Sequence, residues 1–400
     1  MSNSVEVFDS NLSRIKYINA YVLAILIVPT TLDYFFIGSS AARYSRILIF
    51  LGISASLIIN RESMFKSRLI GMETIALTVI LYVIGTFSAV TQGGVITPNI
   101  ALLLVFLLVV SANIDSSQNI LKSMALSSHL LVALSALVIL LKLNPLGLYF
   151  NSKGYPVYFD SIGIPGRNYG IFMHPNILGQ ASCISLLFML VFKVNKIYLV
   201  LPLFCLVKCG SRTAIIGALV GTVLYYTSSF FKSRKVSSKL RKIEYPLVVG
   251  TSVMAVLLAS SAQFLQYINL IDPNGLNSRG KIWQNSLAVF KESSLLGLGW
   301  DWEKRAIESQ LLSIWAVSAH NAILEITFSA GIVGLFIFLL YLSKILVYFS
   351  NLTLIEKILI LAIVVSGISE SYIDLQYPTF QTYLFFTIVV GANKDIMKHS

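Results

Sequence analysis

The sequence predicts an all-α, polytopic membrane protein with about twelve transmembrane helices. Of its 400 residues, 56% are hydrophobic and only 12% are charged, whereas typical globular domains carry about 25% charged residues. The mean hydropathy is +0.79. A water-soluble fold with this composition has too little polar surface to cover itself. A cytosolic enzyme, a disordered chain and a coiled coil are therefore excluded.

Apolar runs near the bilayer-crossing length of roughly 17–25 residues predict the helices in chain order. The predicted spans are residues 17–38, 46–60, 69–90, 95–112, 120–141, 171–192, 197–210, 212–231, 245–262, 322–342, 352–369 and 379–392. The segment from Ile197 to Phe231 is long for one helix and short for two, and Pro202, Lys208 and Arg212 interrupt it. No cleavable signal is expected, since the apolar run after the polar N-terminus is long enough to span.

The distribution of basic residues decides the sidedness. Cytoplasmic loops of membrane proteins carry an excess of Lys and Arg. With a cytoplasmic N-terminus and two spans within 197–231, most of the 30 Lys and Arg, including the cluster from Lys232 to Lys242, face the cytoplasm. A single span would turn this cluster outward. Two spans are therefore predicted, and both termini are expected in the cytoplasm.

This topology makes residues 1–400 a single membrane domain with two outer loops, 142–170 and 263–320. The larger loop is expected to contain short helices, because Trp283, Leu287 and Phe290 recur at amphipathic spacing. Such a helix would rest on the membrane interface or roof a cavity, and packing is the alternative for each aromatic residue. The segment from Gly297 to Trp300 predicts a loop with close backbone approach.

Basic residues on the outer side are the most informative feature. Arg167, Arg212 and Arg279 each lie in a turn rich in Gly, Ser and Asn. An arginine at a membrane boundary must reach the headgroups or find an anion. A guanidinium binds phosphate bidentately, and backbone N–H groups in such turns help to hold it. The three turns together favour an anion site over headgroup contacts, and the net charge of +12 agrees with a polyanionic ligand.

Two histidines are expected at the outer ends of helices. His320 precedes the helix that begins Ala-Ile-Leu-Glu325, and His174 precedes Pro175. A neutral imidazole there can take a proton from an attacking hydroxyl. The alternative for His320 is a capping or interfacial histidine, and for His174 a structural first turn, since Pro suits a helix start.

Other candidate chemistry is weaker. The three cysteines have no metal-ligand spacing and are expected to be small core residues. Five carboxylates in or near spans are expected at headgroup level, with a proton or ion route as the alternative; they are Asp33, Glu73, Glu325, Glu370 and Asp374. No nucleotide or metal motif occurs, and the basic stretches lack the stacking aromatics of nucleic-acid binders.

Four segments, in this order, resemble the bacterial O-antigen ligase and polymerase superfamily of membrane glycan transferases. They are 166–170 with 174–179, 210–214, 278–283 followed by 296–299, and 320–325 with Gly331 and Gly334. The resemblance covers about residues 160–345. The chain departs from the family where Ser294-Leu-Leu replaces a common Pro before the Gly-x-Gly turn, which affects the detail of that loop.

The resemblance implies transfer of a glycan from undecaprenyl pyrophosphate to a hydroxyl acceptor, with inversion and with no metal, nucleotide or other cofactor. It implies Arg212 and Arg279 as pyrophosphate ligands, His320 as the base with Asn321 beside it, and Arg167 and His174 as glycan-holding residues. The enzyme would lie in the bacterial inner membrane with a periplasmic active site. Its partners would be the lipid-linked oligosaccharide donor, a glycan or lipid A core acceptor, membrane lipids and a chain-length regulator, but not nucleic acid.

Three functions remain open. The segment from Arg167 to Gly179 looks more like surface-polysaccharide polymerases than ligases, which favours a repeat-unit polymerase over an O-antigen ligase that acts on lipid A core. A lipid-linked glycan flippase or other transporter is the third candidate. It is less favoured, because transporters generally show pseudo-symmetric halves with polar sites in mid-membrane, whereas the polar residues here cluster on one side.

Overall fold

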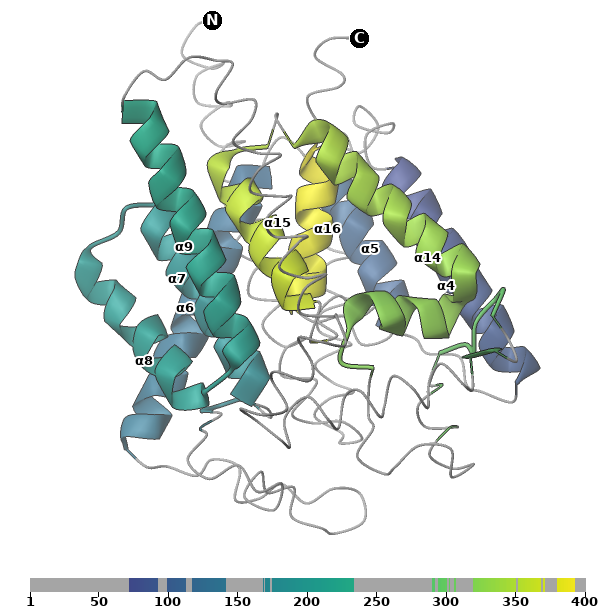
Figure 1. Ribbon diagram of the computed structural model, residues 1–400, viewed down its shortest axis with the longest axis horizontal. Coiled ribbons are helices and arrows are strands. Elements are labelled where there is room, and N and C mark those ends of the chain that lie inside the picture. Colours follow the sequence, from purple (N-terminus) through teal and green to yellow (C-terminus); the bar gives the residue numbers. More distant parts are fainter. Residues whose placement is uncertain are drawn as a thin grey trace, which may run out of the picture. The chain divides into compact units, whose positions relative to one another are not determined.

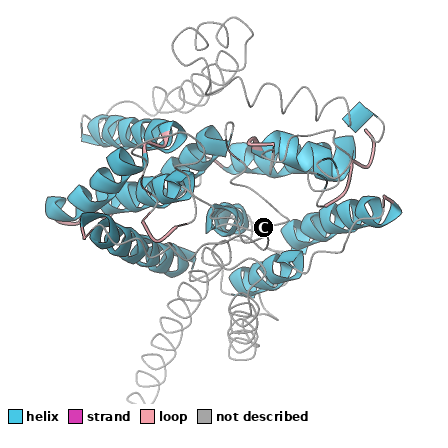
Figure 2. Cartoon of the chain, turned by 90° about the horizontal axis from the view of Figure 1, so that it is seen from below, coloured by secondary structure: helices cyan, strands magenta, loops and turns pink. Residues whose placement is uncertain are grey.

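The computed structural model describes residues 72–92, 99–112, 117–141, 168, 170–172, 175–233, 290–291, 294–300, 302, 306, 319–349, 352–367, 370 and 380–392. These residues form helices and the turns that join them, without a strand among them (Figure 2). The predicted all-α class is therefore confirmed for the described part of the chain. The predicted spans 17–38, 46–60 and 245–262 lie outside it.

The helices occur where the apolar runs predict them (Figure 1). Because these runs are uniformly apolar, the helices can be buried or face lipid on every side. In chain order they are α4 (Met72–Thr91), α5 (Asn99–Ala112), α6 (Ser117–Leu140), α7 (Pro175–Val191), the 3-10 helix η3 (Lys196–Leu199), α8 (Val200–Cys209), α9 (Arg212–Ser233), α14 (Ala322–Tyr348), α15 (Leu354–Gly367) and α16 (Phe380–Ala392).

Three described helices are long and apolar enough to cross a membrane: Thr74–Thr91, Ile120–Leu140 and Ala322–Val347. A crossing of the roughly 30 Å hydrocarbon core takes about 20 helical residues. Two shorter apolar helices, Pro175–Val191 and Gln381–Gly391, accompany them. The chain is a membrane protein, and the count of about twelve spans stays a prediction.

The chain divides into two compact units, each made of separate segments. The first unit comprises Met1–Glu73, Leu102–Ala218 and Tyr383–Ser400, and the second Thr74–Ala101 and Leu219–Thr382. In the first unit, α6, α7 and α8 pack against one another. Their shared core includes Val132, Phe172, Leu178, Cys205 and Cys209, which confirms that these cysteines serve as small core residues.

The expected pair of helices within 197–231 is present. Helix α8 ends at Cys209, Gly210 adopts the left-handed conformation with φ 57°, and α9 begins at Arg212. Glycine suits this position because it has no Cβ to clash. Helix α8 has only ten residues, about 15 Å, so α8 by itself is shorter than the predicted span 197–210.

In the second unit, α14 is interrupted at Gly331, where φ is 70° and ψ is −166°. The two parts of α14 run in different directions in Figure 1. A break frees backbone groups that no water can satisfy in a membrane. Residues 294–300, which we call the strap, supply the missing partners.

The strap replaces two helical hydrogen bonds of α14. The N–H groups of Ile332 and Val333, which in a continuous helix would bond to Phe328 and Ser329, instead donate to the carbonyls of Ser294 and Leu295 at 3.0 and 3.4 Å. In return, the carbonyls of Phe328 and Ser329 accept from the strap residues Leu298 and Gly299 at 2.6 and 3.0 Å. The freed backbone groups are therefore paired.

Glycines allow the strap to approach both of its neighbours. A Cβ on Gly297 would lie 2.4 Å from the nitrogen of Gly331, and one on Gly299 would lie 2.2 Å from the nitrogen of Ala89 in α4. Both strap glycines have positive φ. The predicted close backbone approach between Gly297 and Trp300 is confirmed.

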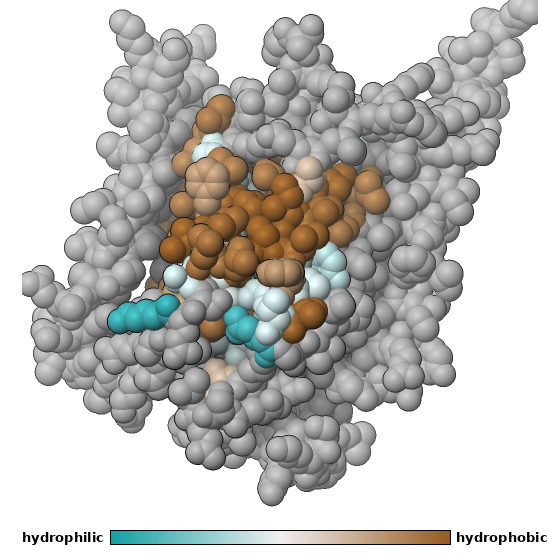
Figure 3. Space-filling view, turned by 90° about the vertical axis from the view of Figure 1, so that its right-hand side faces the viewer, coloured by the Kyte–Doolittle hydropathy of each residue, from teal (hydrophilic) through white to brown (hydrophobic). Residues whose placement is uncertain are grey.

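Helices α4 and α14 of this unit expose large apolar side chains. Figure 3 shows apolar side chains gathered on the face of the molecule that lies to the right in Figure 1. The exposed residues of α4 include Val83 and Phe87, and those of α14 include Phe336 and Val347. Apolar surface of this kind is typical of a helix that contacts lipid.

Candidate functional site at the start of helix α14

The site is built where the chain enters α14. Ala319, His320 and Asn321 directly precede the helix, which begins at Ala322. Of the six residues that the sequence predicts for the site, His320 and Asn321 lie here. Arg212 is described elsewhere in the chain. The other three, Arg167, His174 and Arg279, lie outside the described residues.

Asn321 caps the helix. Its Oδ1 accepts hydrogen bonds from the N–H groups of Ile323 and Leu324 at 2.9 and 3.0 Å. The residue is extended, with φ −158° and ψ 118°, as an N-cap requires. The capping role that was the alternative for His320 therefore belongs to Asn321.

His320 has a left-handed backbone, with φ 49°. This conformation is uncommon outside glycine and costs on the order of 1–3 kcal/mol, so the surrounding structure must impose it. Its side chain is 23% exposed. The imidazole is thus held at an accessible position by a backbone that the flanking contacts determine.

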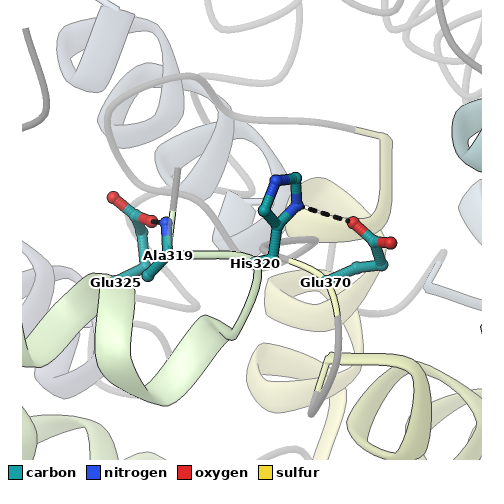
Figure 4. A network of polar contacts seen from close by, with 4 residues as sticks. All are labelled: Ala319, His320, Glu325 and Glu370. Carbon is teal, nitrogen blue, oxygen red and sulfur yellow. Dashed lines mark hydrogen bonds and ion pairs between the residues drawn. The ribbon is translucent and has the colours of Figure 1, made fainter. Parts of the chain in front are cut away.

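One of those contacts is made by Glu325, which is buried one turn inside α14. Its Oε2 accepts the backbone N–H of Ala319 at 2.9 Å, and its Oε1 accepts the indole N–H of Trp302 at 3.0 Å. The carboxylate therefore ties the residue before His320 back onto the helix that follows it (Figure 4).

An apolar cluster surrounds this carboxylate. Trp302 and Phe328 pack edge to face with ring centroids 5.0 Å apart, and Phe290 lies 5.6 Å from Phe328. Leu298 of the strap, Ala306 and Ala319 complete the cluster. Its low polarity strengthens the hydrogen bonds of Glu325. Phe290 is packed, whereas Trp283 and Leu287 of the predicted amphipathic helix lie outside the described residues.

A second carboxylate contacts the imidazole directly. Oε2 of Glu370 lies 3.2 Å from Nδ1 of His320. Glu370 is 5% exposed, so its charge is shielded from water, and it comes from a segment beyond the end of α15. In Figure 4 the His320 ring lies between the Glu325–Ala319 contact on one side and Glu370 on the other.

The expectation of headgroup-level carboxylates does not describe Glu325 and Glu370. Both are buried inside the protein. Glu325 accepts a hydrogen bond from the backbone N–H of Ala319, and Glu370 contacts the imidazole of His320. The sequence motifs give neither residue a role in the site. One signal in the sequence could have identified them: both carboxylates occur in apolar segments. A buried charge requires a partner, so each must contact another polar group.

Arg212 begins α9 in the first unit, and its side chain is exposed. The N–H of Asn168 donates to the carbonyl of Lys208 at 2.9 Å. A Cβ on Gly179 would lie 2.5 Å from Cβ of Ser211. Asn168 and Gly179, from the first motif segments, therefore lie beside the residues that precede Arg212.

The convergence of the arginines with His320 stays a prediction, because Arg212 and His320 belong to separately described units. Within the described ranges, no group of three or more His, Cys, Asp or Glu side chains is arranged to hold a metal ion. His129 is buried in α6 and hydrogen-bonds to Ser185 at 2.9 Å.

Residues 197–339 match the family described as O-antigen ligase. The matched segment is less than half of the chain, and it contains Arg212, Arg279, the strap, His320 and Asn321. It begins in η3 and ends within α14. The resemblance to the O-antigen ligase and polymerase superfamily is thereby confirmed. A comparison of the chain with curated proteins gave no match.

Proposed function

From the match of residues 197–339 to the O-antigen ligase family, we propose that this membrane protein is a glycosyltransferase that uses a lipid-linked donor. The donor is a glycan on undecaprenyl pyrophosphate, and the acceptor is a sugar hydroxyl at the periplasmic face of the inner membrane. The observation that carries the proposal is the position of the His320 imidazole. It is partly exposed, directly precedes α14 within the matched segment, and contacts a buried carboxylate.

His320 is the general base of the reaction. As the acceptor oxygen attacks the anomeric carbon, its proton passes to the imidazole. The bond between that carbon and the pyrophosphate oxygen breaks, and undecaprenyl pyrophosphate leaves. An in-line displacement of this kind inverts the anomeric configuration. General-base catalysis of this type contributes roughly 10²–10⁴-fold to a rate.

Arg212 and Arg279 stabilise the leaving group. Negative charge develops on the pyrophosphate as it departs, and fixed guanidinium groups at a water-poor boundary stabilise this charge more strongly than water does. Their planar forks suit phosphate oxygens. Arg167 and His174 hold the donor or acceptor glycan, a role supported by the packing of their motif against the turn before Arg212.

Asn321 contributes a substrate contact through its amide nitrogen. Its Oδ1 accepts the capping hydrogen bonds of α14, and its Nδ2 is a hydrogen-bond donor of the kind that suits a sugar hydroxyl. The cap fixes the orientation of this amide group. Substrate binding and helix initiation therefore depend on different atoms of the same side chain.

We favour a repeat-unit polymerase, because the segment from Arg167 to Gly179 resembles polymerases of surface polysaccharides more than ligases. A deletion strain separates the two activities. Staining its lipopolysaccharide should show a single repeat unit on the core if a polymerase is lost. Bare core with polymer retained on the carrier would instead indicate an O-antigen ligase.

Purified protein tests the enzymatic function directly. In detergent, with lipid-linked repeat units and no second compartment, the protein should produce longer lipid-linked glycans. A flippase or other transporter would leave the repeat units unchanged under these conditions. Unchanged substrate, together with normal lipopolysaccharide in the deletion strain, would overturn the proposed function.

A further inference from the structure

The contact between Glu370 and His320 joins two parts of the chain that are far apart in sequence. Fifty positions separate the two residues, and their side-chain atoms Oε2 and Nδ1 lie 3.2 Å apart. The family match ends at residue 339, so it includes His320 but not Glu370. This carboxylate therefore extends the site beyond the matched segment.

The backbone of His320 is held on both sides. Glu325 binds the N–H of Ala319, and Asn321 caps α14. These contacts leave the rotation of the imidazole ring about its side-chain bonds as the main freedom of the residue. The Glu370 carboxylate is placed to restrict that rotation, because it reaches one ring nitrogen from a separate segment.

The contact also selects the protonation pattern of the ring. A carboxylate oxygen only accepts hydrogen bonds, so the neutral imidazole must carry its proton on Nδ1 to bond to Glu370. The basic lone pair is then on Nε2. When Nε2 takes a proton, the nearby negative charge stabilises the resulting imidazolium, as in the carboxylate–histidine pair of serine hydrolases.

We propose that Glu370 is the positioning residue that orients His320 and keeps Nε2 as its basic nitrogen. The proposal rests on the proposed function for the role of His320 as general base. Glu370 acts through the imidazole and touches neither donor nor acceptor. Its loss should therefore lower turnover without weakening substrate binding.

The variant Glu370→Gln tests this role. Glutamine has nearly the same size and retains an accepting oxygen, but it lacks the charge that stabilises the imidazolium. We expect kcat for glycan transfer by the purified protein to fall by roughly 10²-fold, with KM changed by less than about threefold. A KM increase without a fall in kcat would overturn the proposal.

Glu356→Gln is the matched control. Glu356 is also a buried carboxylate, and its Oε2 accepts from the N–H and hydroxyl of Thr353 at 2.8 and 2.7 Å at the start of α15. This residue has no part in the proposed reaction. Its variant should retain kcat, so an equal loss of kcat in both variants would indicate a general effect of removing a buried charge and would overturn the proposal.

A double variant separates positioning from a structural role. In a His320→Ala background there is no imidazole to orient, so adding Glu370→Gln should leave the residual rate unchanged. A further loss equal to that seen in the wild-type background would contradict the proposal. Because the comparison is made within one background, reduced yield of folded protein can be corrected by normalising to the amount of monodisperse protein.

The tautomer gives a readout that does not depend on activity. The chain has four histidines, so ¹⁵N spectra of histidine-labelled protein at alkaline pH can be assigned by comparison with His320→Ala. We expect His320 to be protonated at Nδ1 in the wild type and to shift toward the Nε2–H form in Glu370→Ala. Protonation at Nε2 in the wild type would overturn the inference, even if glycan transfer is confirmed.

Discussion

At the residue scale, the start of α14 assigns separate tasks to neighbouring side chains. Asn321 supplies the helix cap, Glu325 holds the backbone of Ala319, and His320 presents its imidazole to Glu370. His320 has a left-handed backbone within this arrangement. Each task depends on particular atoms, so substitutions that remove one atom at a time can test them.

Asn321→Asp should separate capping from substrate binding. Aspartate retains an oxygen that can cap α14 but loses the amide donor, so stability should be kept while transfer falls about tenfold, as expected for one lost hydrogen bond. Asn321→Ala removes the cap as well and should lower stability by about 1 kcal/mol. Thermal unfolding and transfer rates of the two variants provide the measurement. Full activity of Asn321→Asp would limit this residue to capping.

Arg279→Ala should abolish glycan transfer while the protein still folds and inserts into the membrane. The physical reason is the loss of a fixed positive charge that stabilises the departing pyrophosphate. Complementation of a deletion strain, followed by staining of the glycan chains, measures the effect. A normal chain-length distribution would exclude this role for Arg279, and the amount of protein in the membrane fraction provides the control.

At the element scale, the break in α14 at Gly331 is stabilised by the strap of the second unit. The strap bonds to two N–H groups and two carbonyls of α14 beside the break, so the helix can change direction with these four groups satisfied. The part of α14 before the break carries the site residues at its N-terminal end. The strap therefore contributes to the direction in which His320 is presented, although it makes none of the contacts to the imidazole described above.

Gly331→Ala should disrupt this arrangement. A Cβ there would lie 2.2 Å from the carbonyl oxygen of Leu295, and alanine disfavours the positive φ of 70°. Since backbone atoms cannot move as readily as a flexible side chain, we expect a loss of more than about 2 kcal/mol in stability and a strong reduction in transfer. Thermal unfolding in detergent gives the first quantity.

Gly367→Ala is the control for that experiment. Gly367 ends α15, and a Cβ there would meet Cβ of Ala322 at 3.5 Å, an ordinary contact. This variant should be tolerated, with a change in stability within about 1 kcal/mol. Equal destabilisation by the two substitutions would contradict the role given to the break in α14.

At the scale of the whole molecule, the membrane topology determines which residues can act together. The proposed function requires the turn before Arg212 and the start of α14 to lie on the same side of the membrane. Helix α8 is critical for this topology, because its ten residues are fewer than the roughly 20 that cross a bilayer. With η3 it must still carry the chain from the cytoplasmic to the periplasmic side.

Cysteine labelling tests the path of α8. Lys196 and Lys208 are exposed at opposite ends of the η3–α8 segment, whereas the native cysteines are buried. In intact cells with a permeable outer membrane, an impermeant maleimide should label Lys208→Cys and Ile323→Cys, the latter near His320. Lys196→Cys should react only after the inner membrane is opened. If Lys208→Cys and Ile323→Cys were labelled from opposite sides of the membrane, Arg212 and His320 could not act in one active site.

Local patterns predicted much of this protein. Apolar runs indicated most ends of the described helices to within a few residues, and the turn that contains Arg212 separated the two spans predicted within 197–231. Motif segments indicated the family and directed attention to His320. These features depend on hydropathy, on backbone preference or on short motifs. Residues close together in the sequence determine all three.

Contacts over long sequence distances supplied the rest. The exchange of hydrogen bonds between the strap and α14 joins Leu298 to Phe328, and the imidazole contact joins His320 to Glu370. A carboxylate in an apolar segment shows from its sequence that it requires a partner, but only folding selects that partner. The composition and local order of this chain therefore settled its membrane character, helices and family. Tertiary packing decided where α14 breaks and which buried charges meet at its start.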